Sequence, residues 1–242
     1  MKKYTSVWML CARSTIWKLL GALLVMILGE TGLFFHAAES GKTLSAVFSA
    51  SHIPLFVFAL FLAWDKALLV LGFSKASQTL YRLQISPRAL LVCQTLYNAL
   101  CYVIFWAAQV ALLLVLFHRF GATADEALYG PQSIFLLFCE NSFLHSLLPL
   151  MDWTRYIRNL CFALMLGSAS AYCTLHTAAG PRFLAVALPI LMLFCFPCPL
   201  HQIQLDLLGS LVALVIFGIF IWSCHSDLEA PVKTEVDLHE ET

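Results

Sequence analysis

Three short patterns in the sequence have the residue types of a nucleotide-binding or reactive site. The first is Gly41-Lys42-Thr43, which matches the end of a phosphate-binding loop. The complete pattern has another glycine five residues earlier, where this chain has His36, and it follows a β-strand, whereas an apolar helical segment precedes it here. We therefore predict that the chain has no ATP-binding site of its own.

The second pattern is Cys195-Phe-Pro-Cys198, followed by His201. A zinc site needs four protein ligands, or three ligands and a water molecule, and no second cysteine pair completes this one. Two prolines in this stretch end a helix, because proline lacks the amide hydrogen that a helix interior requires. We interpret the pattern as the end of an apolar span and predict no metal site.

The third pattern, Gly167-Ser168-Ala-Ser170, resembles the surroundings of a serine nucleophile. A serine nucleophile needs a base within hydrogen-bond reach, and no motif places a histidine beside it. Ala163, Gly167 and Ala171 instead form a stripe of small residues that allows helices to approach closely, and Gly209 with Ala213 forms another. We predict helix packing here and no hydrolase activity, and the chain is not expected to be an enzyme.

Polar side chains inside apolar segments are more informative. Ionisable or amide groups at membrane depth are costly, so they mark a functional pathway by default. Asp65 and Lys66 also fit a cytoplasmic extension that begins after Trp64, and both interpretations stay open. The residues that we expect to line a translocation path are Glu30, Asp65, Gln94, Asn98, Gln109, Glu140 and His145.

Residues 74–88 form a basic connector between two apolar segments, which places it in the cytoplasm. Its apolar residues suit a short helix, and Ser86-Pro87 suits the start of the next helix. Such a helix can serve as a docking surface for a soluble partner, and the alternative is a solvated basic turn that only sets the orientation of the chain. The residues that we expect to contact this partner are Leu80, Tyr81, Arg82, Leu83 and Ile85.

The composition explains why these residues need a bilayer around them. Of the 242 residues, 61% are hydrophobic and only 12% are charged, which is about half the charged share of a soluble domain. These values exclude a disordered chain, a coiled coil and a basic nucleic-acid-binding protein. The apolar runs are continuous and do not alternate with period two, which excludes a β-barrel. We predict an all-α integral membrane protein.

Six segments are long and apolar enough to cross a bilayer, or nearly so. They are residues 17–36, 50–73, 87–118, 158–178, 183–200 and 207–224. The segment 132–150 contains a glutamate, a histidine and a proline, and it is either a seventh span or a re-entrant segment. With Lys66 left out, nine cations lie inside and four outside in both topologies, so the positive-inside rule does not decide. We expect six spans, because a segment this polar is a poor lipid-exposed helix.

The two ends of the chain have different compositions. Residues 1–16 combine aromatic and cationic side chains, which suits a helix at the membrane interface, and the transmembrane domain is expected over 17–224. Residues 225–242 are acidic and have no apolar period, so we predict a solvated, flexible tail.

The order of these elements resembles the ABC-2 type permease subunits of bacterial ABC transporters. The resemblance covers most of residues 1–224 and is carried by Thr79-Leu-Tyr-Arg-Leu-Gln-Ile-Ser86, Tyr97-Asn98-Ala99 with Trp106-Ala-Ala-Gln109, and Phe143-Leu-His-Ser-Leu-Leu-Pro149. It implies a cell-membrane location, residues 74–88 as the coupling segment, a soluble ATP-binding subunit that holds ATP and magnesium, and a second permease chain. The polar segment 132–150 departs from the plain layout of spans.

Two classes of function follow. The first is the membrane-spanning subunit of an ATP-driven transporter, most simply an exporter, that works with a separate ATP-binding protein and no nucleic acid. The second is a multi-pass membrane protein without transport activity, such as an assembly, immunity or sensor component. A gene for a soluble ATPase beside this one would favour the first class.

Overall fold

The computed structural model describes residues 2–39, 86–123, 131–150, 152–175 and 202–229, together with positions 187 and 191. Within these ranges the chain is helical and contains no strand. Among the predicted spans, 50–73 lies outside the described residues, and so does 183–200 except for two helical positions. The interfacial lead-in and the first predicted span form one unbroken helix, α1 (Lys2–Glu39).

Two long helices begin at or near their predicted first residues and extend five residues beyond their predicted ends. Helix α5 (Pro87–Thr123) begins at the proline that we expected to start it, and the amide of Leu90 donates to the carbonyl of Ser86 at 3.1 Å. Helix α10 (Ile203–Glu229) begins four residues before the predicted span and extends five residues beyond it. The first residues of the predicted flexible tail are therefore helical, and residues 230–242 lie outside the described part of the chain.

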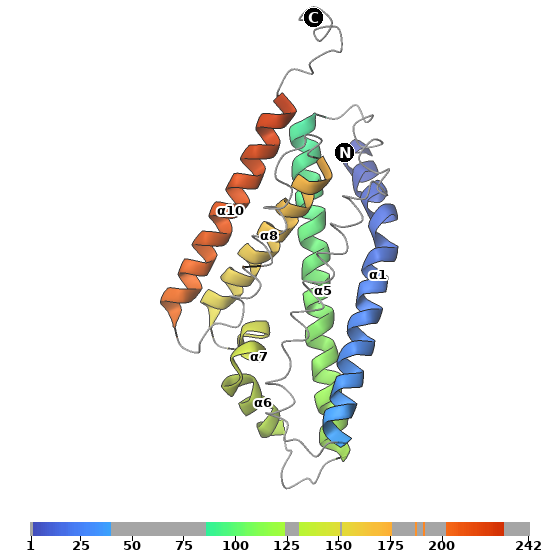
Figure 1. Ribbon diagram of the computed structural model, residues 1–242, viewed down its shortest axis with the longest axis vertical. Helices are drawn as coiled ribbons and strands as arrows, with labels where there is room; N and C mark the ends of the chain where they lie inside the picture. Colours follow the sequence, from blue (N-terminus) through green and yellow to red (C-terminus); the bar gives the residue numbers. More distant parts are fainter. Residues whose placement is uncertain are drawn as a thin grey trace, which may run out of the picture.

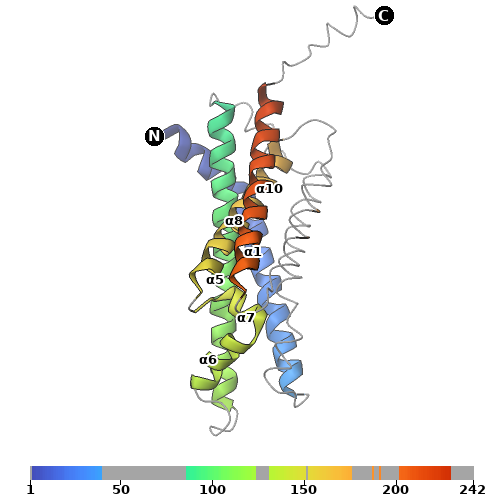
Figure 2. The ribbon, with the colours of Figure 1, turned by 90° about the vertical axis from the view of Figure 1, so that its left-hand side faces the viewer.

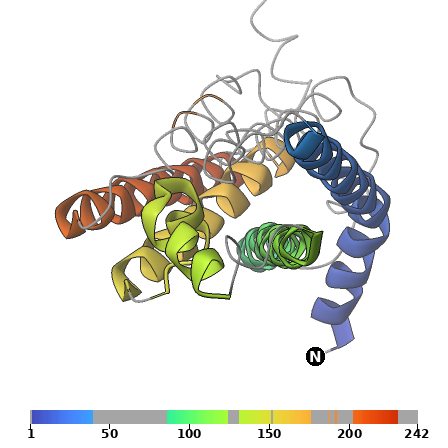
Figure 3. The ribbon, with the colours of Figure 1, turned by 90° about the horizontal axis from the view of Figure 1, so that it is seen from below.

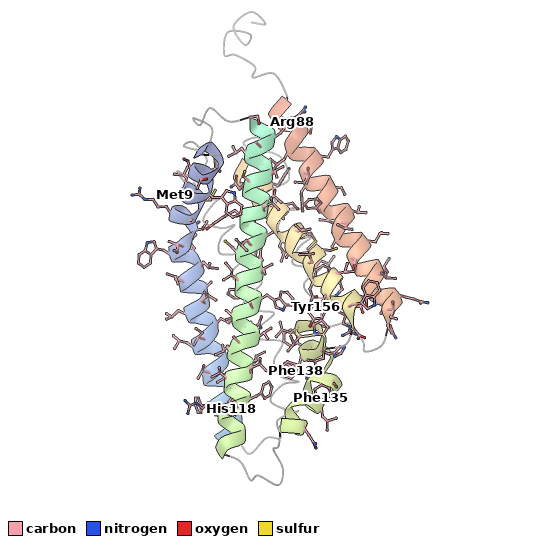
Figure 4. The ribbon with its side chains drawn as sticks, turned by 180° about the vertical axis from the view of Figure 1, so that it is seen from behind. Met9, Arg88, His118, Phe135, Phe138 and Tyr156 are labelled. Carbon is pink, nitrogen blue, oxygen red and sulfur yellow. The ribbon has the colours of Figure 1, made fainter. Side chains whose placement is uncertain are left out.

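The segment between α5 and α8 forms two short helices, α6 (Pro131–Glu140) and α7 (Ser142–Leu147). Asn141 separates them, because its side-chain oxygen accepts hydrogen bonds from the amides of Phe143 and Leu144 at 3.0 and 3.2 Å and caps α7. Helix α6 packs through Phe138, whose ring centre lies 5.6 Å from that of Phe117 on α5, whereas Phe135 is exposed (Figure 4).

The four longer helices lie in the order α1, α5, α8 (Trp153–Leu175), α10, with α6 and α7 beside the lower part of α5 (Figures 1 and 3). Helices α1 and α5 both begin at the upper end of the molecule, whereas α8 and α10 begin lower and run upward (Figures 1 and 2). Helix α8 is therefore antiparallel to α5 and parallel to α10.

Helix α8 approaches α5 most closely at Gly167. A β-carbon built at this position would lie 2.6 Å from the carbonyl oxygen of Thr95 and 2.8 Å from the amide nitrogen of Ala99. The predicted use of small residues for helix packing is confirmed here, because only a glycine leaves room for the α5 backbone. Ser168 donates to the carbonyl of Met165 at 2.8 Å, so its hydroxyl is used within the helix.

Three of the described helices are long and apolar enough to cross a membrane. The corresponding stretches are Thr15–His36 in α1, Arg88–Arg119 in α5 and Ile203–Cys224 in α10. The expectation of a helical, multi-pass membrane protein is confirmed at this level. Helix α8, which contains most of the predicted span 158–178, does not join the three, and it is the most completely buried of the long helices. Its first turns carry Arg155, Arg158 and Asn159, which lower its apolar character.

Candidate functional site: a buried ionic cluster and the polar face of α5

Two arginines and one aspartate meet where α8 and α10 begin. Arg155 and Arg158 are three residues apart and share one face of α8, and Asp206 lies in the first turn of α10. Nε of Arg155 lies 3.2 Å from Oδ2 of Asp206, and Nη1 of Arg158 lies 2.7 Å from Oδ1. The three residues are 0, 1 and 2% exposed, so this carboxylate is shared by two guanidinium groups away from solvent.

Residues of α8 and α10 around the cluster accommodate the arginine side chains. Gly209 lies against the stem of Arg158, because a β-carbon at this position would be 3.4 Å from its Cδ. The guanidinium carbon of Arg158 lies 5.8 Å from the centre of the Phe162 ring, within the range of a cation–π contact. Ser210 donates to the carbonyl of Asp206 at 2.8 Å and supports the first turn of α10.

Helix α7 completes the cluster from the other side. Nη1 of Arg155 donates to the hydroxyl of Ser146 at 3.3 Å, and Nδ2 of Asn159 donates to the carbonyl of Ser146 at 2.8 Å. Nε2 of His145 lies 2.8 Å from Oδ2 of Asp152, and Nε of Arg155 lies 3.8 Å from the same oxygen. We call these seven residues the α7–α8–α10 cluster: His145, Ser146, Asp152, Arg155, Arg158, Asn159 and Asp206.

The charges of this cluster balance when His145 is neutral, because two guanidinium groups face two carboxylates. Buried ions are tolerated only when they are paired and hydrogen-bonded, and Arg155 meets this condition by linking all three helices. Nδ1 of His145 and Oδ1 of Asn159 are buried and make no hydrogen bond within the described ranges. The arrangement fixes α7 to the starts of α8 and α10, and the Ser146 hydroxyl, which donates to the carbonyl of Ser142, is not placed as a nucleophile.

A second polar contact joins α1 to α5. Glu30 is buried, and Nε2 of Gln109 donates to its Oε1 at 3.2 Å. At the other end of the same interface, the hydroxyl groups of Thr15 and Tyr97 lie 2.6 Å apart, and the ring centres of Trp8 and Tyr97 lie 6.0 Å apart. Glu30 and Gln109 were both expected at a functional pathway, and the structure brings them into contact.

The remaining amides of α5 face the same interior. Gln94 is buried, and Asn98 lines a cavity of about 30 Å³ together with Lys18 of α1 and Ser170 of α8. The hydroxyl of Ser170 lies 3.0 Å from that of Tyr102, so this serine is also engaged in helix packing. The volume suffices for about one water molecule.

Only some of the residues predicted for a site lie within the described parts of the chain. Asp65 and the whole docking set lie outside the described residues; this set is Leu80, Tyr81, Arg82, Leu83 and Ile85. Glu140 is the last residue of α6. His145 belongs to the cluster, whereas Glu30, Gln94, Asn98 and Gln109 lie along α1 and α5.

Sequence reasoning missed the three most buried ions of the cluster. Arg155 and Arg158 were among the cations counted for the positive-inside rule, outside with six spans and inside with seven, and Asp206 was not considered. The available signal was a lone aspartate at the start of one apolar run and two arginines, one turn apart, at the start of another. An isolated charge in such a position needs a partner on another helix.

Within the described residues, no group of three or more histidine, cysteine, aspartate and glutamate side chains is arranged to hold a metal ion. No protein-family model, no curated protein and no solved structure matches this chain. The fold and the site therefore stand on their own geometry.

Proposed function

We propose that this protein is the membrane-spanning subunit of an ATP-driven transporter of the ABC-2 type, located in a bacterial cell membrane. A soluble ATP-binding protein supplies the energy, and a second permease chain completes the complex. The observation that carries the proposal is the polar interior of α5, because Gln94 and Gln109 are buried inside the helix pack instead of being replaced by apolar side chains. Buried polar residues in spans mark pathways in transporters.

The length and position of α5 also support the proposal. Its 37 residues correspond to about 56 Å, which exceeds the ~30 Å hydrocarbon core. Helix α5 begins at the end of the basic connector, so its first turn lies on the side where the partner ATPase would dock. Movement of the connector is then passed along one rigid helix to the buried amides.

The topology that belongs to this proposal has six spans and a re-entrant segment at 132–150. Helix α8 runs antiparallel to α5, which fits a chain that enters and leaves α6 and α7 at the same end (Figure 1). The burial of Arg155 and Arg158 supports the same topology, since ion-paired arginines inside the protein are poor loop cations. Arg155 and Arg158 are outside in the six-span topology and inside in the seven-span topology. Leaving them out of the count gives nine cations inside and two outside for six spans, but seven inside and four outside for seven spans.

The first test is the location of the chain end. A reporter enzyme that is active only in the cytoplasm, fused after residue 242, should be active in whole cells, because six spans return the end of α10 to the side of the N-terminus. The same reporter fused after residue 124 should be inactive. Inactivity of the 242 fusion would overturn the six-span topology, and inactivity of both fusions would favour seven spans.

The second test is retention of the ATPase. An ATP-binding protein encoded beside this gene should co-elute with the chain in mild detergent. Leu83→Ala should weaken the association by about 1–3 kcal/mol, because apolar anchors carry most of the energy of a docked helix. Arg82→Ala is the matched control and should matter less, with an effect that shrinks at high salt.

Stimulated ATP hydrolysis should follow the same order as retention, with expression level as the control. If the chain is monodisperse and never retains the ATPase, the transporter proposal fails, and a multi-pass protein without transport activity is the better assignment.

A further inference from the structure

Glu30 is a carboxyl group that the helix packing encloses, and none of the described cationic side chains pairs with it. Its side chain is 6% exposed, and among the residues that the structure describes its buried Oε2 has no hydrogen-bond partner. Within the described part of the chain, its only polar contact is the hydrogen bond from Nε2 of Gln109 to Oε1, and no cationic side chain lies within ion-pair distance. It also lies within the stretch Thr15–His36, which is apolar enough to cross a membrane.

The basic side chains nearest to this contact along the two helices are exposed. They are His36 on α1 and His118 and Arg119 on α5. Among the described residues, an ionised carboxylate in this place would be balanced by one neutral amide donor, which is unfavourable away from solvent. A neutral carboxylic acid needs no counter-charge, and its carbonyl oxygen still accepts the hydrogen bond from Gln109.

A metal cation fits this site less well than a proton. Calcium takes six to eight oxygen ligands and magnesium takes six. Here Gln109 presents its amide NH₂ to Glu30, and an NH₂ group repels a cation. In the described part of the chain, the two carboxylate oxygens alone do not make a coordination shell.

We propose that Glu30 is a proton-binding site, neutral while α1 packs on α5 at Gln109, and that loss of its proton to water separates the two helices at this point. The step breaks one O–H bond and leaves a carboxylate, which then requires solvent. This inference goes beyond ATP-driven transport and needs only the chain itself, so its failure would leave that proposal untouched.

Infrared difference spectroscopy of the purified chain in lipid vesicles at neutral pH tests the proton directly. Subtracting the spectrum of Glu30→Gln from that of the wild type should leave the C=O stretching band of a protonated carboxyl group, and this band should shift in D₂O. Asp152→Asn is the matched control: Asp152 is 30% exposed and lies beside His145 and Arg155, so its removal should delete carboxylate bands only. Loss of carboxylate bands alone in Glu30→Gln would overturn the proposal.

Two further measurements test whether the site binds a metal ion and whether loss of the proton separates α1 from α5. The protonated band should be the same in sodium, potassium and choline buffers, and a band that disappears in one of these cations would assign a metal ion to the site instead. Raising the pH should lower the melting temperature of the wild type more than that of Glu30→Gln. The glutamine side chain has the shape of a protonated glutamate but has no proton to lose. Equal slopes for the two proteins would contradict the separation of α1 from α5.

Discussion

Replacing Asp206 by alanine should reduce the free energy of unfolding by about 3–5 kcal/mol, the largest effect that we expect from a single polar substitution. The reason is that Arg155 and Arg158 would keep their charges inside the protein while losing the buried carboxylate that they share. Unfolding in mixed micelles, with increasing fractions of a denaturing detergent and helical content as the signal, measures the change.

A matched pair of variants separates the loss of the ion pair from the loss of packing. Asp152→Asn removes a carboxylate that is 30% exposed, so its cost should be well below that of Asp206→Ala. The triple variant Arg155→Met, Arg158→Met, Asp206→Leu removes all three buried charges together and should be more stable than Asp206→Ala, because apolar side chains of similar volume replace buried ion pairs at little cost. A triple variant less stable than Asp206→Ala would contradict this account.

Gly167→Ala should also destabilise the protein, by about 1–3 kcal/mol, although alanine is the better helix former. The added methyl group would lie 2.6 Å from the carbonyl oxygen of Thr95 and 2.9 Å from the β-carbon of Ala99, and the backbone of α5 must move to accept it. Gly167→Leu should prevent the α5–α8 contact altogether. Thermal unfolding in detergent, followed by tryptophan fluorescence and size-exclusion chromatography, gives the comparison.

Gly218 in α10 is the control for this prediction, because nothing lies within 4 Å of a β-carbon built there. Gly218→Ala should be neutral or stabilise by up to about 1 kcal/mol from helix propensity. If both alanine variants stabilise the protein equally, the close approach of α8 to α5 at Gly167 does not exist in the membrane.

The sequence predicted the features that depend on one helix at a time. The apolar stretches of α1, α5 and α10, the start of α5 at Pro87 and the use of Gly167 for packing all follow from local composition and spacing. The pairing of Glu30 with Gln109 needed more, because each polar side chain was recognisable alone but its partner lies 79 residues away. The same limit hid the α7–α8–α10 cluster, since Asp206 meets Arg158 across 48 residues.

The position of α6 and α7 depended on a different kind of information. The polar residues of 132–150 indicated a segment unlike a plain span, and Asn141 explains the break after α6 through its cap. Which way α8 runs relative to α5 is a property of the tertiary structure, and periodicity does not contain it. The six-span and seven-span topologies therefore have the same numbers of inside and outside cations. These numbers differ only when the buried Arg155 and Arg158 are left out of the count.

The unbroken course of α1 has a mechanical consequence. Tyr97 holds the helix at Thr15, and Gln109 holds it at Glu30, which is 15 residues or about 22 Å further along the axis. With the contact at Tyr97 as the pivot, α1 has two arms of similar length, about 20 Å from Lys2 to Thr15 and about 22 Å from Thr15 to Glu30. A tilt of about 5° moves the Glu30 end by about 2 Å, which is enough to break a hydrogen bond of 3.2 Å. A displacement of the first turns of α1 is therefore matched by one of similar size at Glu30, and, under the proposal that Glu30 binds a proton, loss of that proton would move the first turns in the same way.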